Sequence, residues 1–338
     1  MAEWHGLYSV TWNVTKKCNF SCKHCYVSKY TEPDLSTEEA KDMINQIADF
    51  GVKELYMSGG EPLMREDIFD LAKYSVDLGL HTDVITNGWF VDREIAKKFK
   101  DSGVNHVSVS VDGFEDTHDY IRNKPGSFKK CMEAIKILRD ADVKTFLAPT
   151  FSKYNLHQLQ DLMKLAEKMD SSFSCKVMIP MGNASNLKEK CLNPEEQREF
   201  YEGLLARRND PENKLEIVTT CDPYSIFLEK GEDLPTSEDR ILGGCTGGIT
   251  LICIGADGTV TPCSRLQLPV GNIRRESLEK MWYNSDVLKT LRDRDNLKGK
   301  CGTCKYRNLC GGCRAMAMAQ TGDPLAEDPT CWLKPESG

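Results

Sequence analysis

Short apolar runs alternate with longer mixed stretches over the first 180 residues or so of the chain. The runs predict buried strands, and the stretches between them, with their capping residues and glycine stops, predict helices. We expect strands at residues 7–14, 53–57, 81–86, 105–111, 143–150 and 173–180, and helices at 36–50, 68–78, 92–102, 128–140 and 156–169. This alternation predicts an α/β fold with a parallel sheet and right-handed crossovers. Since eight units complete a TIM barrel, six units predict an open, partial (β/α)6 TIM-like barrel.

Candidate chemistry follows the ends of these strands, where parallel α/β folds place their active sites. Cys18, Cys22 and Cys25 follow the first strand with C-x3-C-x2-C spacing. Three thiolates on one tight loop can hold three corners of a cubane iron–sulfur cluster and leave the fourth iron open. A zinc site is the alternative on these residues alone.

The chain changes character toward its C-terminal end. Residues 194–214 are charged and predict a helix, and the residues after Cys221 are rich in glycine and cysteine. We expect three parts: a barrel (1–190), a helical linker or bridge (191–240) and a small domain (241–338). The last part has few apolar residues, so bound metal is expected to supply its folding energy.

The composition of the chain argues against several classes of function. The net charge of −7 argues against nucleic acid as the main partner, and the apolar runs are too short and too charged to span a membrane. The first residues do not form a secretory signal, so the 15 cysteines are not expected to form disulfides. Their clustering at both ends of the chain instead indicates metal, and we expect a cytoplasmic protein.

The cysteine loop, with Tyr26 directly after it and Gly59-Gly60-Glu61-Pro62 after the next strand, resembles the radical S-adenosylmethionine (SAM) enzymes. The resemblance implies that Cys18, Cys22 and Cys25 hold a [4Fe–4S] cluster whose open iron binds SAM. One electron then cleaves SAM to a 5′-deoxyadenosyl radical, which abstracts hydrogen from a substrate. The implied activity is that of a radical SAM oxidoreductase or lyase, with a ferredoxin or flavodoxin as electron donor.

The same resemblance implies contacts with SAM. Gly59, Gly60 and Glu61 would meet its amino group, Tyr26 would lie near the adenine, and Ser110 and Asp112 would contact the ribose or the carboxylate. The glycines suit this role because a side chain would hold the backbone away from the ligand. Loop packing is the alternative for Tyr26, and a hydrogen-bonded turn carboxylate is the alternative for Asp112.

The C-terminal cysteines resemble the SPASM extension of radical enzymes, which binds auxiliary iron–sulfur clusters. The implied ligand sets are Cys301, Cys304, Cys310 and Cys331 for one cluster, and Cys245, Cys253, Cys263 and Cys313 for the other. Two residues separate Cys310 from Cys313 where the family pattern has three, which leaves the place of Cys313 open. If Cys253 is not a ligand, one cluster has an open iron. Zinc binding by the C-x2-C pairs is the alternative.

The segment around Cys221 and the tail after Cys310 resemble the radical enzymes of the alternative haem and haem d1 pathways. These modify acetate or propionate side chains of sirohaem-derived tetrapyrroles. Cys221 is then a candidate catalytic residue, and a buried structural cysteine is the alternative. The carboxylates of such a substrate need cations, for which the loops offer Lys16, Lys17, Lys23, Arg122, Lys124 and Arg265.

Two other functions stay open. One is a SPASM-type peptide maturase that forms thioether or carbon–carbon crosslinks in a ribosomal peptide. Few residues precede the cysteine loop, whereas such enzymes often carry an N-terminal leader-binding domain, so this function is the second choice. The other is a zinc-stabilised binding module without redox chemistry.

Overall fold

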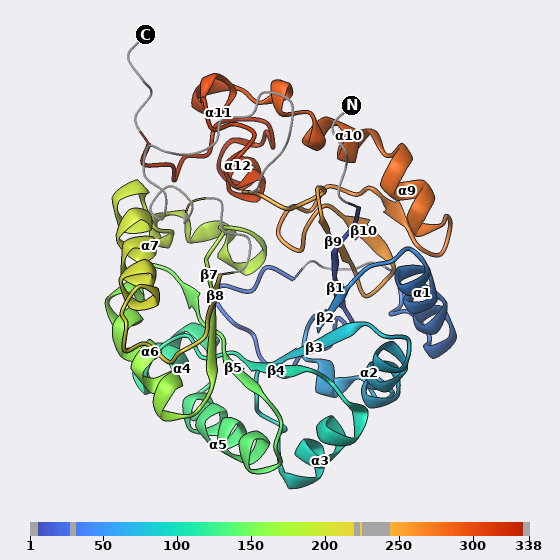
Figure 1. Ribbon diagram of the computed structural model, residues 1–338, viewed down its shortest axis with the longest axis vertical. Coiled ribbons are helices and arrows are strands. Elements are labelled where there is room, and N and C mark those ends of the chain that lie inside the picture. The colour runs from blue at the N-terminus through green and yellow to red at the C-terminus, as the bar shows by residue number, and fades with distance from the viewer. Residues whose placement is uncertain (1–5, 28–31, 220–223, 225–243, 334–338) are drawn as a thin grey trace.

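The computed structural model describes residues 6–27, 32–219, 224 and 244–333 (Figure 1). Strands and helices alternate along the barrel part as predicted. Its elements are β1 (Ser9–Asn13), α1 (Thr37–Asp49), β2 (Glu54–Ser58), α2 (Ile68–Asp77), β3 (His81–Thr86), α3 (Arg93–Ser102), β4 (His106–Val109), α4 (Glu115–Arg122), α5 (Ser127–Asp140), β5 (Thr145–Leu147), β6 (Thr150–Phe151), α6 (Leu159–Lys168), β7 (Ser172–Val177), α7 (Pro194–Arg208) and β8 (Ile217–Thr219).

The C-terminal part has shorter elements. They are β9 (Leu251–Ile254), β10 (Thr259–Thr261), β11 (Gly271–Asn272), α9 (Leu278–Asn284), α10 (Asp286–Arg292), α11 (Gly299–Thr303) and α12 (Arg314–Thr321). Short 3-10 turns lie at Pro62–Met64, Leu156–Gln158, Gly182–Asn186, Lys188–Lys190 and Arg294–Asn296. Within the described ranges, no helix is long and apolar enough to cross a bilayer.

The sheet confirms the predicted open barrel. Neighbouring strands run in the order β9-β1-β2-β3-β4-β5-β7-β8, and every pair in this run is parallel. The strands β8 and β9 therefore add one parallel strand to each edge of the predicted six. In Figure 1, α1, α2, α3, α5 and α6 lie outside the strands, and the orange and red C-terminal elements lie across the open side.

Capping residues mark the start of α1 and the end of α3. Ser36 accepts from the Glu39 backbone N–H at 3.2 Å, and Glu39 accepts from the Ser36 backbone N–H at 2.8 Å, which completes the capping box of α1. The buried positions of α1 recur at helical spacing and face the sheet. Gly103 ends α3 in the left-handed conformation, with φ of 74°.

Three elements differ from the sequence prediction. Helix α4 was not predicted, although acidic Glu115 and Asp116 in its first turn favour a helix start. The strand expected at 143–150 is interrupted, because Pro149 lacks the N–H that a continuous ladder needs. Helix α7 ends at Arg208 instead of continuing to residue 214.

The cysteine-rich C-terminal part shares the sheet and the core of the barrel. Strand β9 pairs with β1, and its Ile252 and Ile254 belong to the same buried cluster as Trp12. Arg274 binds the Glu39 carboxylate through two contacts of 2.6 and 2.8 Å, which lowers the pKa of Glu39 to about 2. The division into three parts stays a prediction, and the first and third are joined by β-sheet hydrogen bonds.

Candidate active site

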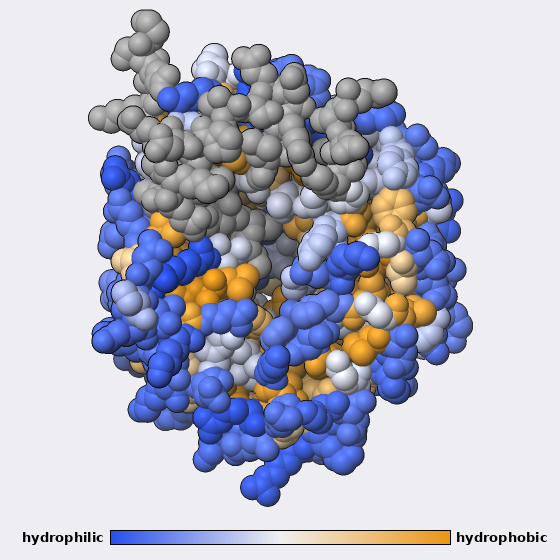
Figure 2. All heavy atoms as spheres, in the orientation of Figure 1, coloured by the Kyte–Doolittle hydropathy of each residue, from blue (hydrophilic) through white to orange (hydrophobic). Residues whose placement is uncertain are grey.

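A cavity of about 480 Å³ lies inside the barrel. Its lining comes from the cysteine loop, from the carboxyl ends of the strands and from side chains deeper along β2, β3 and β4. Figure 2 shows the molecule hollowed near the centre of this face, with hydrophobic side chains beside the hollow. The volume of this cavity and its mixed apolar and polar lining are typical of a binding site for a small molecule.

The cysteine loop forms one wall of this cavity. Cys18, Cys22 and Cys25 all line it, and all three are free thiols. The residues after β7 fasten the loop: Asn183 donates through its backbone N–H to Cys25 O at 2.8 Å and through Nδ2 to Cys22 O at 3.0 Å. Three soft ligands are thereby held at the mouth of the barrel.

The Gly-Gly-Glu turn packs against the segment that leads into the loop. The Gly60 N–H donates to Thr15 O, and the Glu61 N–H donates to Lys17 O, each at 2.8 Å. A Cβ at residue 60 would lie 2.1 Å from Lys17 O, so this position requires glycine. Gly59 and Gly60 both line the cavity, and their contact with SAM stays a prediction.

The Glu61 carboxylate is buried and holds the end of β3. It accepts from Thr86 Oγ1 at 2.7 Å and from the Asn87 N–H at 2.8 Å. Burial raises the pKa of Glu61, although these hydrogen bonds oppose the rise. The Asn87 amide in turn donates to Asn19 Oδ1 of the cysteine loop at 2.7 Å. Glu61 therefore connects β3 to the loop, and its contact with the SAM amino group stays a prediction.

Asp112 forms a buried ion pair behind the loop. Its Oδ2 lies 2.6 Å from Arg122 Nε and 3.2 Å from His24 Nε2, and its Oδ1 accepts from the Thr150 N–H at 2.8 Å. Burial disfavours the carboxylate, but Arg122 and His24 outweigh burial and hold the pKa of Asp112 far below its usual range. This geometry matches the turn-carboxylate alternative, and a contact with ribose stays a prediction.

Arg122 and His24 are the residues that sequence reasoning did not assign to this ion pair. Arg122 was expected as a substrate cation, yet α4 carries it to Asp112 and places its Nη1 3.9 Å from Cys22 Sγ. Both side chains line the cavity. Predicting this ion pair would have required helix α4, which ends at Arg122 beside the cysteine loop and was not predicted.

Tyr26 and Ser110 line the cavity where they were expected. Burial raises the pKa of Tyr26 to about 12, while hydrogen bonds with Ser264 and Ser58 oppose the rise. The Gln267 amide donates to Tyr26 O at 2.8 Å, which ties the end of the loop to the C-terminal part. Cys221 lies outside the described residues.

Of the six expected cations, Lys16 donates through Nζ to Glu32 O at 3.3 Å, and Lys17 is exposed. Arg122 and Arg265 line the cavity, together with Lys176 of β7. Lys23 Nζ lies 4.0 Å from the centroid of the Tyr120 ring, and Lys124 Nζ lies 4.6 Å from that of Trp89. The latter two lysines therefore stack on aromatic rings at the rim.

The auxiliary cysteines gather in two neighbouring groups. Burial raises the pKa of the Cys310 thiol well above its usual value, and the nearby Cys331 and Cys301 thiols add to the rise. The second group is Cys245, Cys263 and Cys313, which line one small cavity. This arrangement follows the interleaving that the SPASM resemblance implied, and the ligand sets themselves stay predictions.

Cys253 and Cys304 have other described contacts. Cys253 lies in β9, and its thiol accepts from Asn13 Nδ2 at 3.7 Å. Cys304 accepts from the Tyr306 N–H at 3.4 Å. Cys253 as a fourth ligand therefore needs an experimental test.

The residues around both cysteine clusters fit iron–sulfur clusters. Burial raises the pKa of Cys22 to about 11, so its thiolate needs a bound cation at neutral pH. At the auxiliary groups, buried Arg294 donates to Cys245 O at 3.1 Å, and its Nε and Nη1 have no hydrogen-bond partner in the described part of the chain. Buried Arg314 contacts Cys301 Sγ at 3.5 Å. Buried cations beside cysteines suit an anionic cluster.

Family models match both parts of the chain. The Radical SAM superfamily model matches residues 12–166, and the model of the iron-sulfur cluster-binding domain known as SPASM matches residues 245–305. The first match spans the cysteine loop and the strands β2 to β6. The second covers five of the eight auxiliary cysteines named above, from Cys245 to Cys304.

Relatives match over nearly the full length. The AdoMet-dependent heme synthase of Methanosarcina barkeri is 35% identical, over 96% of this chain and 96% of that protein. The pre-heme d1 synthase of Dinoroseobacter shibae is 30% identical, over 96% of this chain and 86% of that protein.

A solved structure shares the fold. Streptococcus suis SuiB, bound to its precursor peptide SuiA, superposes with a TM-score of 0.81 at 18% identity, over 97% of this chain and 76% of that chain. The cofactors of the fold are accordingly SAM, a [4Fe–4S] cluster with an open iron and auxiliary iron–sulfur clusters. With the cysteine loop, the cavity and these matches together, the chain belongs to the radical SAM superfamily of enzymes and carries a SPASM domain.

Proposed function

We propose that this enzyme modifies a side chain of a sirohaem-derived tetrapyrrole in haem or haem d1 biosynthesis. The cavity is the observation that carries the proposal: the cysteine loop forms one wall, and Lys176 and Arg265 lie in the same lining. Guanidinium and ammonium groups suit a substrate with several carboxylates. The names of the heme synthase and pre-heme d1 synthase relatives support the same substrate class.

Cys18, Cys22 and Cys25 would hold the catalytic cluster at this wall. When bound, the cluster and SAM supply the 5′-deoxyadenosyl radical that abstracts hydrogen. The backbone at Gly59 and Gly60 would receive the amino group of SAM. The ion pair between Asp112 and Arg122 holds the end of α4 against the loop, and thereby fixes the thiolates.

The auxiliary groups would hold two further clusters. Cys301, Cys304, Cys310 and Cys331 are proposed for one, and Cys245, Cys263 and Cys313 for the other. The electron donor would be a ferredoxin or flavodoxin in the cytoplasm. Cys221 is proposed as a donor of a proton or hydrogen to the substrate.

Anaerobic turnover tests the proposal. Reconstituted, reduced protein is incubated with SAM and iron-containing or metal-free tetrapyrroles, and 5′-deoxyadenosine and product mass are followed together. We expect deoxyadenosine to rise with a mass change at a carboxylated side chain. The triple variant Cys18→Ala, Cys22→Ala, Cys25→Ala is the control and should form none.

Two other outcomes would contradict the proposed function. Deoxyadenosine formed with a precursor peptide but with none of the tetrapyrroles would replace this substrate with the peptide-maturase alternative. A protein that contains zinc and no iron after anaerobic preparation would contradict radical chemistry altogether.

A further inference from the structure

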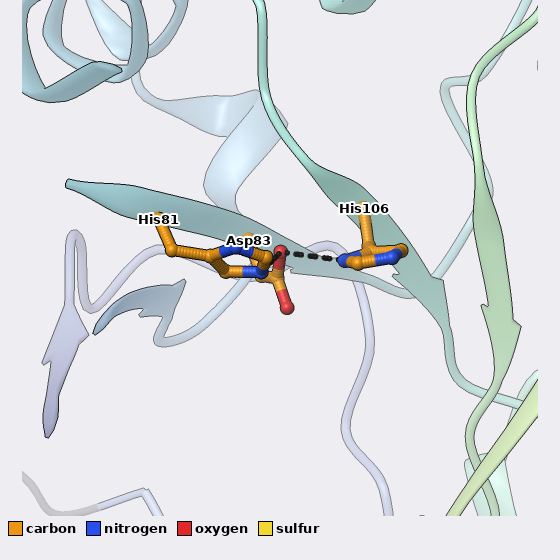
Figure 3. A group of neighbouring side chains, drawn as sticks. All are labelled: His81, Asp83 and His106. Carbon is orange, nitrogen blue, oxygen red and sulfur yellow. Dashed lines mark hydrogen bonds and ion pairs between the residues drawn. The ribbon is translucent and has the colours of Figure 1, made fainter. Parts of the chain in front are cut away.

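Two imidazoles and a carboxylate face one another deep in the barrel (Figure 3). His81 and Asp83 lie two residues apart on β3, so their side chains share one face of the sheet. Asp83 pairs across the sheet with His106 of β4, whose ring points to the same carboxylate. We propose that His81, Asp83 and His106 bind a divalent transition-metal ion that faces the cavity.

The spacing of the donor atoms fits a metal. Asp83 Oδ1 lies 3.3 Å from His81 Nε2 and 3.2 Å from His106 Nδ1, and the three atoms all lie within 4.8 Å of one another. Two ligands of a tetrahedral metal with bonds of about 2.0–2.1 Å lie about 3.3–3.4 Å apart. The two separations that involve Asp83 Oδ1 therefore match those of neighbouring metal ligands.

The local charge also favours a cation. Glu54 of β2 lies beside His81 across the sheet and lines the same cavity. Tyr56 donates to Glu54 Oε2 at 2.7 Å, and burial together with the Glu54 and Asp83 carboxylates raises the pKa of Tyr56 above its usual value. The Glu54 and Asp83 carboxylates bring negative charge to this part of the cavity, which a divalent ion would offset.

This site is separate from the cysteine loop. Asp83 lies three residues before Thr86, the last residue of β3, which corresponds to about 10 Å along the strand. The cysteine loop follows the carboxyl end of β1, and both groups line the same cavity.

The donor set indicates the class of metal and its accessibility. Imidazole and carboxylate ligands suit Zn²⁺ or Fe²⁺, and three protein ligands leave a coordination position open. The His106 ring packs on Phe146 with centroids 4.9 Å apart, which orients the ring. The Asp83 side chain is 8% exposed and that of His81 is 40% exposed, and both residues line the cavity.

Zinc uptake by the cluster-loaded, full-length protein tests the proposal. Excess metal is removed, Zn²⁺ is added by equilibrium dialysis, and zinc and iron are counted per chain. We expect one more zinc ion in the wild type than in the double variant His81→Asn, His106→Asn. His157→Ala removes an exposed imidazole outside the cavity and should match the wild type. Asp83→Asn alone should weaken binding at least about tenfold.

X-ray absorption at the zinc edge supplies a second measurement that needs no variant. We expect nitrogen and oxygen ligands at about 2.0–2.2 Å and no sulfur at about 2.3 Å. Equal zinc uptake by wild type and double variant, sulfur in the ligand shell, or no uptake by the wild type at about 1 mM Zn²⁺ would overturn the proposal. Should the double variant lose iron through misfolding, the ligand shell of the wild type decides.

Discussion

Removing the Arg122 guanidinium should destabilise the barrel strongly. In Arg122→Met the Asp112 carboxylate, whose side chain is 0% exposed, loses its guanidinium partner and keeps the His24 ring at 3.2 Å. Breaking a buried ion pair from one side costs about 3–5 kcal/mol, because the remaining charge stays buried without compensation. At about 2 °C per kcal/mol, the lower end of the range for large domains, this corresponds to a fall in Tm of at least about 6 °C.

The assay is anaerobic thermal unfolding of cluster-loaded protein at one fixed scan rate, because unfolding that releases clusters is irreversible. Arg139→Met is the matched control. The Arg139 side chain is 40% exposed and lies 3.6 Å from Asp140, so its loss should change stability by less than about 0.5 kcal/mol.

A second variant separates charge from packing. Asp112→Asn combined with Arg122→Met removes both charges and should recover most of the lost Tm, since replacing a whole buried pair is often close to neutral. The reasoning is refuted if Arg122→Met and Arg139→Met lower Tm equally, or if the double variant is no more stable than Arg122→Met alone.

Three further predictions follow from the site. Gly60→Ala should lower the iron content of the N-terminal loop, because the new Cβ would lie 2.1 Å from Lys17 O. The control is Gly6→Ala, whose Cβ would have no atom within 4 Å. Equal iron content in the two variants would contradict the packing argument. Cys253→Ala should have the iron content of the wild type, whereas Cys263→Ala should lose up to about four iron atoms per chain. An equal loss in Cys253→Ala would show that Cys253 is a ligand. Burial lowers the pKa of His118 to about 4 in the folded protein. Between about pH 6.5 and 4 the imidazole is therefore protonated in the unfolded chain and neutral in the folded one. The free energy of unfolding consequently falls as the pH falls through that range. Between pH 7.5 and 5.5 the loss should be about 1 kcal/mol in wild type and smaller in His118→Asn, measured as Tm against pH; an equal loss in both would assign the pH dependence elsewhere.

Local patterns in the sequence were sufficient to predict the order of strands and helices along the barrel and the cysteine loop after the first strand. The apolar runs and the Ser36 capping box are short-range patterns, so they located β1 to β4 and β7 within a few residues, whereas β5 and β6 were expected as one strand. The Gly59-Gly60 turn was also visible, but the reason for its glycines was not. The structure shows that Gly60 is required by contact with Lys17 O, a contact between two strand ends.

Contacts between distant segments were not predictable. The ion pair of Asp112 with Arg122 and His24 depends on α4 returning toward the cysteine loop, and no local pattern encodes that direction. His81 and Asp83 show two-residue spacing in the sequence, yet only the register of β3 with β4 brings His106 to them. Burial of a polar face inside a barrel follows from closure of the sheet, which a single strand does not reveal.

The pairing of β9 with β1 has a consequence for biosynthesis. Ser9 and Leu251 are register partners although 242 residues separate them. At about 5–20 residues per second, roughly 12–48 s pass between the synthesis of the two strands. During that time one edge of β1 has no neighbour, and an open strand edge is a template for association with other chains. The loop with Cys18 follows β1 directly, so the strand before this metal-binding loop gains its second neighbour only after residue 254 has been synthesised.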